Sequence, residues 1–283
     1  MSTAEASSGN RGGFLSRRRL GKWTLNTFAT AAFIFVLLPL IFVTWLSFYS
    51  QEIPSFPPDG YSTRWYSAAI GNSRFIDAFW LSLRVGVIAT LIGLALALPA
   101  AIAITRFQFR GRTTVNNLML MPLIVPGIVL GIALYVFQVE TEIATGIRML
   151  SSPLGLIFGH TLLVIPWSVR LITASLIGFD RTQEEAAMNL GATPFVAFRR
   201  VTMPAILPGI VAGAMFGFVA SFGNLELSLF LVGPGRTTLP IAILQYLEWR
   251  IDPTIAAVSV LQILIIVVAM LITDRFVRIS RVV

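Results

Sequence analysis

The sequence EEAAMNLGATPFVAFRRVTMP, residues 184–204, lies between two strongly apolar segments and predicts two short helices joined by a turn. Thr182 and Glu185 are spaced as a capping box, in which each side chain bonds a free backbone N–H of the other residue. Gly191 supplies the left-handed residue that ends the first helix after Leu190. The local chemistry therefore predicts a first helix that begins near Thr182 and stops at Gly191.

The second half of this stretch carries its own start signal. Thr193 is expected to cap a second helix whose first position is Pro194, where the missing N–H costs nothing. Pro204 is expected to interrupt the helix again, just as the next apolar run begins. A polar helix–turn–helix between apolar segments is either a docking element for a soluble partner or a well-capped loop, and capping signals alone favour neither.

The composition of the chain is that of a membrane protein. Of its 283 residues, 56% are hydrophobic and only 12% are charged, whereas soluble domains carry about 25% charged residues. The mean hydropathy is +0.82. Cysteine is absent, which excludes a disulfide framework and a thiolate metal site. The net charge of +8 is explained better by where the basic residues lie along the chain than by nucleic-acid binding.

Six apolar segments each approach the ~20 residues that a bilayer crossing requires, so we expect an all-α, polytopic membrane protein with six transmembrane helices. Residues 1–26 are rich in Ser, Gly and Arg and are expected to form a disordered, basic cytoplasmic tail before a transmembrane domain of residues 27–283. A signal peptide is the rival interpretation, but the first apolar run is longer than a signal core of about 7–15 residues and no small-residue cleavage site follows it. The expected spans are residues 27–49, 78–104, 115–138, 153–178, 205–232 and 254–273.

Basic residues are divided unequally between the two sides of these spans. Fourteen Lys and Arg residues lie in one set of segments and five lie in the alternate loops. The positive-inside rule places the richer set in the cytoplasm, so both termini and the loop of residues 179–204 are expected to be cytoplasmic. The richer set is Arg11, Arg17, Arg18, Arg19, Lys22, Arg106, Arg110, Arg112, Arg181, Arg199, Arg200, Arg275, Arg278 and Arg281; the poorer set is Arg64, Arg74, Arg148, Arg236 and Arg250.

The same loop carries a motif of fixed spacing. Glu185-Ala186-Ala187 is followed after three residues by Gly191, and after nine more by Val201-Thr202-Met203-Pro204. This pattern resembles the EAA loop of bacterial ABC-importer permeases, with apolar replacements in its usual Ile-x-Leu-Pro ending. The resemblance covers most of the chain by the number and order of spans, and it implies a type I ABC-importer permease in the bacterial inner membrane.

The resemblance also implies partners. In that family the loop seats in a groove of an ATP-binding subunit, which holds ATP and Mg²⁺, so no cofactor and no catalysis are expected in this chain. We expect two ATP-binding subunits, a second and distinct permease, a periplasmic or extracellular solute-binding protein and membrane lipid as partners, and no nucleic acid. The expected ATPase-coupling residues are Glu184, Glu185, Ala186, Ala187, Gly191, Pro194 and Pro204.

Within the family, residues 221–240 and 252–257 resemble the second permease of spermidine/putrescine-type importers. Those permeases often carry an acidic pair where this chain has Gly223 and Asn224, and the acid here is Glu226 instead. A polyamine-like solute is therefore the favoured substrate, with an opine, an aminophosphonate or another small organic solute as the alternative.

Polar residues inside spans are costly and therefore carry functional hypotheses. Gly223-Asn224 could break the fifth span, as in transporters that build solute contacts from broken helices. The alternative is that Glu226 reaches the outer interface or pairs with a partner subunit. The residues expected to line the path are Ser221, Asn224 and Glu226, with Tyr135 and Trp167 as aromatic walls.

Other span residues are expected to be structural. Gly209, Gly213 and Gly217 have the spacing that lets helix backbones approach closely in lipid. The prolines of the third span, Pro122 and Pro126, are expected to bend it. His160, the one histidine of the chain, is expected to be packed and hydrogen-bonded rather than to act as a ligand.

The catalytic inventory is empty. The sequence has no Gly-rich Lys-Ser/Thr phosphate loop, no Cys/His metal spacing, and no carboxylate arranged beside its single histidine. A membrane enzyme is thus disfavoured. An ion-coupled secondary transporter is also disfavoured, because it predicts several intramembrane carboxylates and two matching halves, and the sequence shows one carboxylate and no inverted hydropathy repeat.

Overall fold

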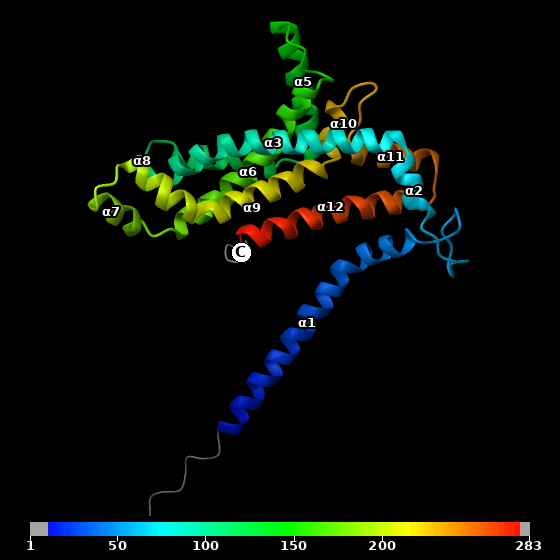
Figure 1. Ribbon diagram of the computed structural model, residues 1–283, viewed down its shortest axis with the longest axis horizontal. Helices are drawn as coiled ribbons and strands as arrows, with labels where there is room; N and C mark the ends of the chain where they lie inside the picture. The colour runs from blue at the N-terminus through cyan, green and yellow to red at the C-terminus, as the bar shows by residue number, and fades with distance from the viewer. Residues whose placement is uncertain (1–10, 278–283) are drawn as a thin grey trace, which may run out of the picture.

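A computed structural model describes residues 11–277 of the chain, with side chains from 22 to 275 (Figure 1). Helix α1 begins at Arg11, so residues 11–26 of the tail that was predicted to be disordered are helical. Residues 1–10, and with them the start of the predicted tail, lie outside the described part, as do Arg278 and Arg281.

The described residues form helices and no strand beyond one isolated bridge between Tyr49 and Tyr61, which confirms the all-α class. The elements are α1 (Arg11–Leu46), α2 (Arg64–Gly71), α3 (Ser73–Arg106), α4 (Arg112–Leu120), η1 (Met121–Leu123), α5 (Gly127–Thr145), α6 (Pro153–Gly178), α7 (Thr182–Asn189), α8 (Pro194–Ala197), η2 (Phe198–Thr202), α9 (Met203–Phe222), α10 (Glu226–Leu231), α11 (Leu239–Trp249) and α12 (Thr254–Val277).

Six helical stretches in the described range are long and apolar enough to cross a bilayer, which confirms the number of spans. The first, second, fourth and sixth lie close to their predicted positions. The third and fifth differ at their ends, for reasons given below. The six stretches are Lys22–Leu46, Ser73–Arg106, Gly127–Thr145, Pro153–Gly178, Pro194–Phe222 and Thr254–Arg275.

The third span is shorter than predicted and starts later. Pro122 lies in the 3₁₀ turn η1, and Pro126 has the extended ψ of 134° that ends one helix before another starts. The predicted bend at these prolines is confirmed, but they separate α4 from α5 completely. The spanning helix therefore begins at Gly127 rather than at residue 115.

Helices α3, α6 and α9 pack together as the core of the bundle (Figure 1). The glycine row of α9 faces α6, as the spacing predicted: Gly209 lies against Ser175, Gly213 against Ser168 and Gly217 against Val164. A Cβ at Gly213 would lie 3.0 Å from the Cα of Ser168, so a side chain there would push the two backbones apart.

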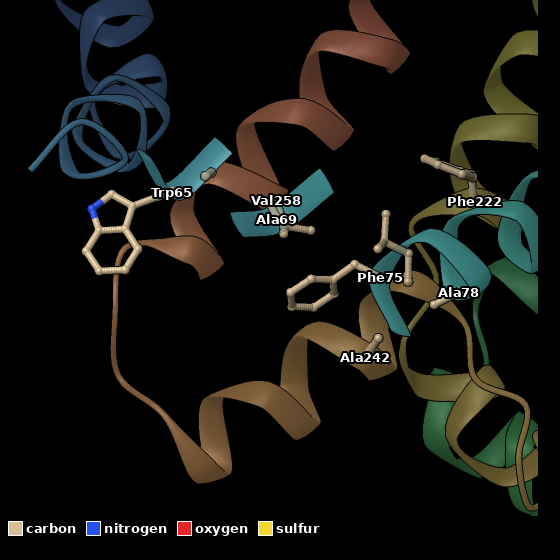
Figure 2. Close-up of a cluster of buried hydrophobic side chains, with 9 residues drawn as sticks. Trp65, Ala69, Phe75, Ala78, Phe222, Ala242 and Val258 are labelled. Atoms are coloured by element: carbon tan, nitrogen blue, oxygen red, sulfur yellow. The ribbon is translucent and has the colours of Figure 1, made fainter. Parts of the chain in front are cut away.

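One end of the bundle is closed by a cluster of buried apolar side chains from five helices (Figure 2). Trp65 and Ala69 of α2 join Phe75 and Ala78 of α3 in this cluster. The indole N–H of Trp65 donates to the backbone oxygen of Tyr49 at 2.6 Å. Burial of a side chain such as Phe75 stabilises the fold by about 1.5–3 kcal/mol. The remaining members are Phe222, Leu239, Ala242, Ala257 and Val258.

Helices α1 and α5 extend away from this bundle in opposite directions (Figure 1). None of the most apolar window of α1 is buried, and only 17% of that of α5 is. Their apolar faces are thus available to lipid or to another membrane subunit.

Candidate functional site: the loop after α6 and the break in the fifth span

The loop after α6 begins differently from the prediction. Helix α7 starts at Thr182 itself, so Thr182 occupies its first helical position and makes no capping bond from its side chain. The backbone N–H of Thr182 instead donates to Asp180 Oδ1 at 3.0 Å. This bond holds the pKa of Asp180 below its ordinary value. The predicted Thr182–Glu185 capping box is therefore wrong, because Asp180 satisfies this end of the helix first.

The turn that follows α7 is as predicted. Gly191 has φ of +93°, the left-handed conformation that ends a helix. The N–H of Ala192 reaches back to the carbonyl oxygen of Ala187 at 3.1 Å, which completes the helix end. Thr193 Oγ1 accepts from the N–H of Val196 at 3.4 Å, with Pro194 in the first turn of α8.

The predicted interruption at Pro204 is wrong. Helix α8, the π-helical turn η2 and helix α9 follow one another without a break. The N–H of Met203 donates to the carbonyl of Phe198, five residues earlier, so the turn is wider than an α-helical turn. A proline ring clashes with the carbonyl four residues before it. The wider turn displaces that carbonyl and lets the helix continue through Pro204.

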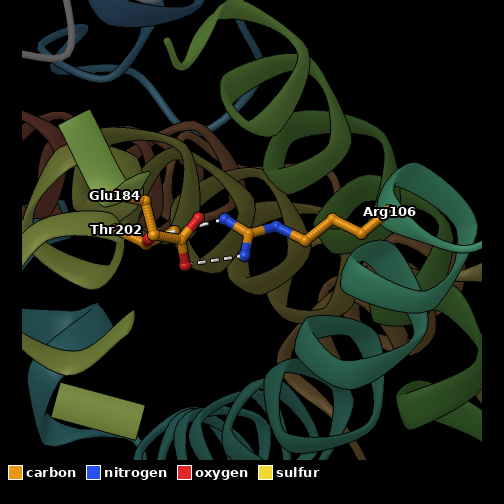
Figure 3. Close-up of polar contacts among 3 residues, drawn as sticks. All are labelled: Arg106, Glu184 and Thr202. Carbon is orange, nitrogen blue, oxygen red and sulfur yellow. Dashed lines mark hydrogen bonds and ion pairs between the residues drawn. The ribbon is translucent and has the colours of Figure 1, made fainter. Parts of the chain in front are cut away.

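Arg106, at the end of α3, joins this loop to the bundle (Figure 3). Its Nη1 lies 2.9 Å from Glu184 Oε1, and its Nη2 donates to Thr202 Oγ1 at 3.4 Å. The two charged side chains are 14% and 10% exposed, and Thr202 is fully buried. Glu184, predicted to couple to an ATPase, thus faces the interior of its own subunit.

The outward face of the loop carries the other predicted coupling residues. Glu185, Ala186, Gly191, Pro194 and Pro204 are exposed, and Ala187 is half-buried.

Two large apolar side chains that sequence reasoning missed lie on the same loop: Leu190 is 90% exposed and Phe195 is 71% exposed. The sequence feature that could have identified them is a pair of apolar residues on either side of the turn at Gly191, within an otherwise polar stretch. We call Glu185, Ala186, Leu190, Gly191 and Phe195 the loop surface. An exposed apolar group rimmed by polar residues is typical of a protein contact.

The fifth span breaks where Gly223-Asn224 predicted. Helix α9 ends at Phe222, and α10 begins at Glu226. Asn224 Oδ1 accepts from the N–H of Leu227 at 2.9 Å and so satisfies the start of α10. The break therefore leaves Asn224 and Glu226 beside non-helical backbone within an apolar segment.

The predicted path residues are only partly brought together. Glu226 is exposed, and its carboxylate lies over Gly127 at the start of α5. Tyr135 is 42% exposed on α5, about two turns further along that helix. Trp167 stacks on Phe216 at 5.6 Å between ring centroids, within the α6–α9 contact.

Ser221 is 2% exposed and its hydroxyl lies 2.8 Å from His160 Nδ1. It therefore faces the interior of the subunit. His160 is also 2% exposed, and its Nε2 lies 3.0 Å from Ser228 Oγ. The prediction of a packed, hydrogen-bonded histidine is confirmed. Among the described residues no three His, Cys, Asp or Glu side chains gather into a group that could hold a metal ion.

Residues 89–281 match the model of the family described as binding-protein-dependent transport system inner membrane component. The chain belongs to this family. It is 31% identical to the putrescine transport system permease protein PotI of Escherichia coli K12 over 230 residues, which cover 81% of this chain and 82% of PotI. It is 27% identical to the spermidine/putrescine permease PotC of the same organism over 258 residues, 91% of this chain and 95% of PotC.

The fold is also that of a solved importer. The structure of a bacterial alginate ABC transporter in complex with an alginate-pentasaccharide-bound periplasmic protein matches with a TM-score of 0.66 at 17% identity. The match covers 94% of this chain and 96% of that chain.

Family membership agrees with the function that the sequence favoured over a secondary transporter and a membrane enzyme. The chain is a multi-pass permease subunit of an ABC importer of the inner membrane. The readings as a secondary transporter and as a membrane enzyme are thereby set aside.

Proposed function

We propose that this permease forms half of a translocation path for a small organic cation, with a polyamine as the favoured solute. The observation that carries the proposal is the exposed carboxylate of Glu226 at the break in the fifth span. A carboxylate held beside non-helical backbone attracts an ammonium group, and the names of PotI and PotC support the same class of solute.

The proposed path is lined by Asn224 and Glu226 from the break, with Tyr135 and Trp167 as aromatic walls. An aromatic face adds roughly 0.5–2 kcal/mol of attraction for an ammonium group. Ser221 is buried against His160, so we leave it out of the residues that touch the solute. Weak contacts suit transport, since a tight site would hold the solute.

The proposed energy source is a pair of ATP-binding subunits that bind ATP and Mg²⁺. The loop surface seats in a groove of one of them, with Leu190 and Phe195 as apolar anchors on either side of Gly191. Their 90% and 71% exposure in the single subunit supports a contact that another protein covers. Ala187, Pro194 and Pro204 shape the backbone of that surface.

The proposed assembly holds a second, distinct permease and receives solute from a soluble binding protein on the outer face. Helices α1 and α5, with their largely unburied apolar windows, support a membrane partner. Both termini and the loop surface face the cytoplasm, in keeping with the bias of basic residues toward that side.

A second class of solute follows from one departure. Gly223 and Asn224 stand where the polyamine permeases that the chain resembles often carry two acids. One carboxylate in place of two favours a solute with fewer positive charges, such as an opine or an aminophosphonate. Glu226 would then pair with a basic residue of the partner permease.

Uptake assays distinguish these candidates. Cells that carry the intact transport system would be supplied with radiolabelled putrescine, in competition with unlabelled spermidine, an opine or an aminophosphonate. Competition by spermidine alone supports the polyamine proposal. Absence of putrescine uptake, with uptake of a labelled opine or aminophosphonate, would replace the polyamine proposal by that solute. Mass measurement of the detergent-purified complex tests the subunit composition.

A further inference from the structure

The break in the fifth span is bridged by one side chain from another helix. His160 lies on α6, and its ring nitrogens contact a serine on each side of the break: Ser221 on α9 at 2.8 Å, and Ser228 on α10 at 3.0 Å. All three side chains are 2% exposed or less. The contacts therefore lie inside the subunit and connect the two helices on either side of the break, α9 and α10.

The hydrogen bonds around Ser228 decide where the imidazole proton resides. The Ser228 hydroxyl donates to the carbonyl of Asn224 at 2.8 Å, and a serine has only one hydrogen to donate. Ser228 Oγ must then accept from His160 Nε2–H. In the neutral ring Nδ1 carries no hydrogen, so it accepts from the Ser221 hydroxyl, and burial without a counter-charge disfavours the charged ring.

These bonds form a directed chain that ends at the break itself. Ser221 donates to His160, His160 donates to Ser228, and Ser228 donates to the carbonyl of Asn224. Asn224 in turn accepts from the N–H of Leu227. The backbone carbonyl of Asn224 is thus tied to α6 through Ser228 and His160.

The two hydrogen bonds of His160, which we call the Ser221 leg and the Ser228 leg, differ in how much they restrain the break. Helix α9 is already fixed to α6 along its glycine row, so the Ser221 leg adds little restraint. Helix α10 is only six residues long and meets α6 through Leu227 and Leu231, which pack on Gly159. The Ser228 leg is its polar tie to that helix.

We propose that His160 is a positioning residue whose Nε2–H bond to Ser228 holds α10 against α6 and so fixes the shape of the break and the place of Glu226. The bond is a property of this subunit. The effect of this bond on transport rests on the proposed path through Glu226, so the shape of the break and the uptake of solute are measured separately.

The absence of cysteine from the chain allows a direct probe of the break. Gly223 is exposed, and its φ of −92° is open to any residue. The nearest atom to a Cβ there is the Val219 carbonyl oxygen, at an ordinary 3.4 Å. Gly223→Cys therefore places a thiol at the break, and its rate of labelling by a charged methanethiosulfonate in the assembled complex reports how closed the break is.

Four variants in this background separate the two legs. Ser228→Ala removes the acceptor of the His160 Nε2–H bond. His160→Asn removes the same bond, because its shorter amide reaches only the place of Nδ1. Both should change the labelling rate about 2- to 10-fold, the range that loss of one hydrogen bond gives. Ser221→Ala, and His160→Gln, whose amide N–H reaches the place of Nε2–H, should stay within about twofold of the parent.

Ser168→Ala is the matched control. Ser168 is a fully buried serine on α6, the helix that also carries His160. Its hydroxyl contacts α9 away from the break, 3.4 Å from the Gly213 carbonyl. General loosening of the bundle would alter labelling in this variant as well. If His160→Asn fails to accumulate, Ser228→Ala alone carries the test.

A labelling rate in Ser228→Ala equal to that in Ser168→Ala overturns the proposal, and so does an equal effect of Ser221→Ala and Ser228→Ala. Altered labelling in Ser228→Ala with unchanged uptake of radiolabelled putrescine supports the bridge and removes the proposed path through Glu226. Altered labelling with impaired uptake supports both.

Discussion

Arg106 and Glu184 are 78 positions apart in the sequence, and their charged atoms lie 2.9 Å from each other where the loop after α6 meets the end of α3. The same guanidinium reaches Thr202 in the π-helical turn. One side chain therefore ties α3, α7 and the start of the fifth span together. Adjacent residues Glu184 and Glu185 consequently have opposite surroundings, one facing the bundle and one facing solvent.

This difference predicts opposite phenotypes for two neighbouring variants. Glu184→Gln leaves Arg106 with an uncompensated, mostly buried charge and should lower the stability of the purified complex by roughly 1.5–3 kcal/mol. Glu185→Gln should leave the stability unchanged, because that side chain is exposed. Thermal unfolding followed by fluorescence measures both. Equal melting temperatures for the two variants would show that the ion pair does not stabilise the loop.

A second prediction tests the left-handed backbone conformation of Gly191. With φ of +93°, a β-carbon is strained, at a cost of roughly 1–2 kcal/mol for a left-handed residue. Gly191→Val should leave membrane insertion intact and separate ATP hydrolysis from uptake, because the loop surface is tilted. Gly178→Val is the control, since Gly178 lacks a positive φ and has nothing within 4 Å of its Cβ position. Uptake at the wild-type rate with full ATPase recovery on a pull-down would contradict the expectation.

The apolar anchors of the loop surface make a separate prediction. Leu190 is 90% exposed, so Leu190→Ser should not destabilise the subunit. Covering such a side chain at an interface is worth about 1.5–3 kcal/mol, and its loss should reduce recovery of the ATP-binding subunits several-fold. Leu207→Ser, at a partly exposed leucine on α9, is the control. Unaltered recovery with Leu190→Ser would remove this residue from the contact.

Glu226→Gln keeps the shape of the side chain and removes its charge. For a cationic solute the exposed carboxylate should contribute about 0.2–1 kcal/mol, so KM for radiolabelled putrescine should rise by a factor of roughly 1.4 to 5. Glu248→Gln, at another exposed acid on α11, should leave KM unchanged. Loss of complex yield before loss of uptake would instead assign Glu226 to a contact with the partner permease. Wild-type values of both would exclude it from either role.

The features that sequence alone predicted are those with a local cause. The length of an apolar run sets the number of spans, and Gly191 and Thr193 set the turn of the loop. Gly223-Asn224 sets the break, because a glycine followed by a cap-forming residue favours the start of a new helix. Each of these signals lies within a few residues of the feature that it specifies.

The features that were missed depend on distant partners or on competition between neighbours. Nothing near Glu184 in the sequence announces Arg106, and nothing near Ser221 announces His160, 61 positions away. Thr182 failed as a cap because Asp180, two residues earlier, satisfies the same helix end. The π-helical turn before Pro204 likewise has a distant partner, since Thr202 within it accepts a hydrogen bond from Arg106.

The unbroken helix from Pro194 to Phe222 has a mechanical consequence. Its 29 residues span about 43 Å at 1.5 Å per residue. The tightest backbone contact with α6 is at Gly209, where a Cβ would lie 2.8 Å from the carbonyl oxygen of Leu171. It divides the helix into arms of about 22 Å toward the loop and about 20 Å toward the break. If the helix pivots at Gly209, a displacement of about 2 Å at its loop end moves Phe222 by nearly the same distance in the opposite direction.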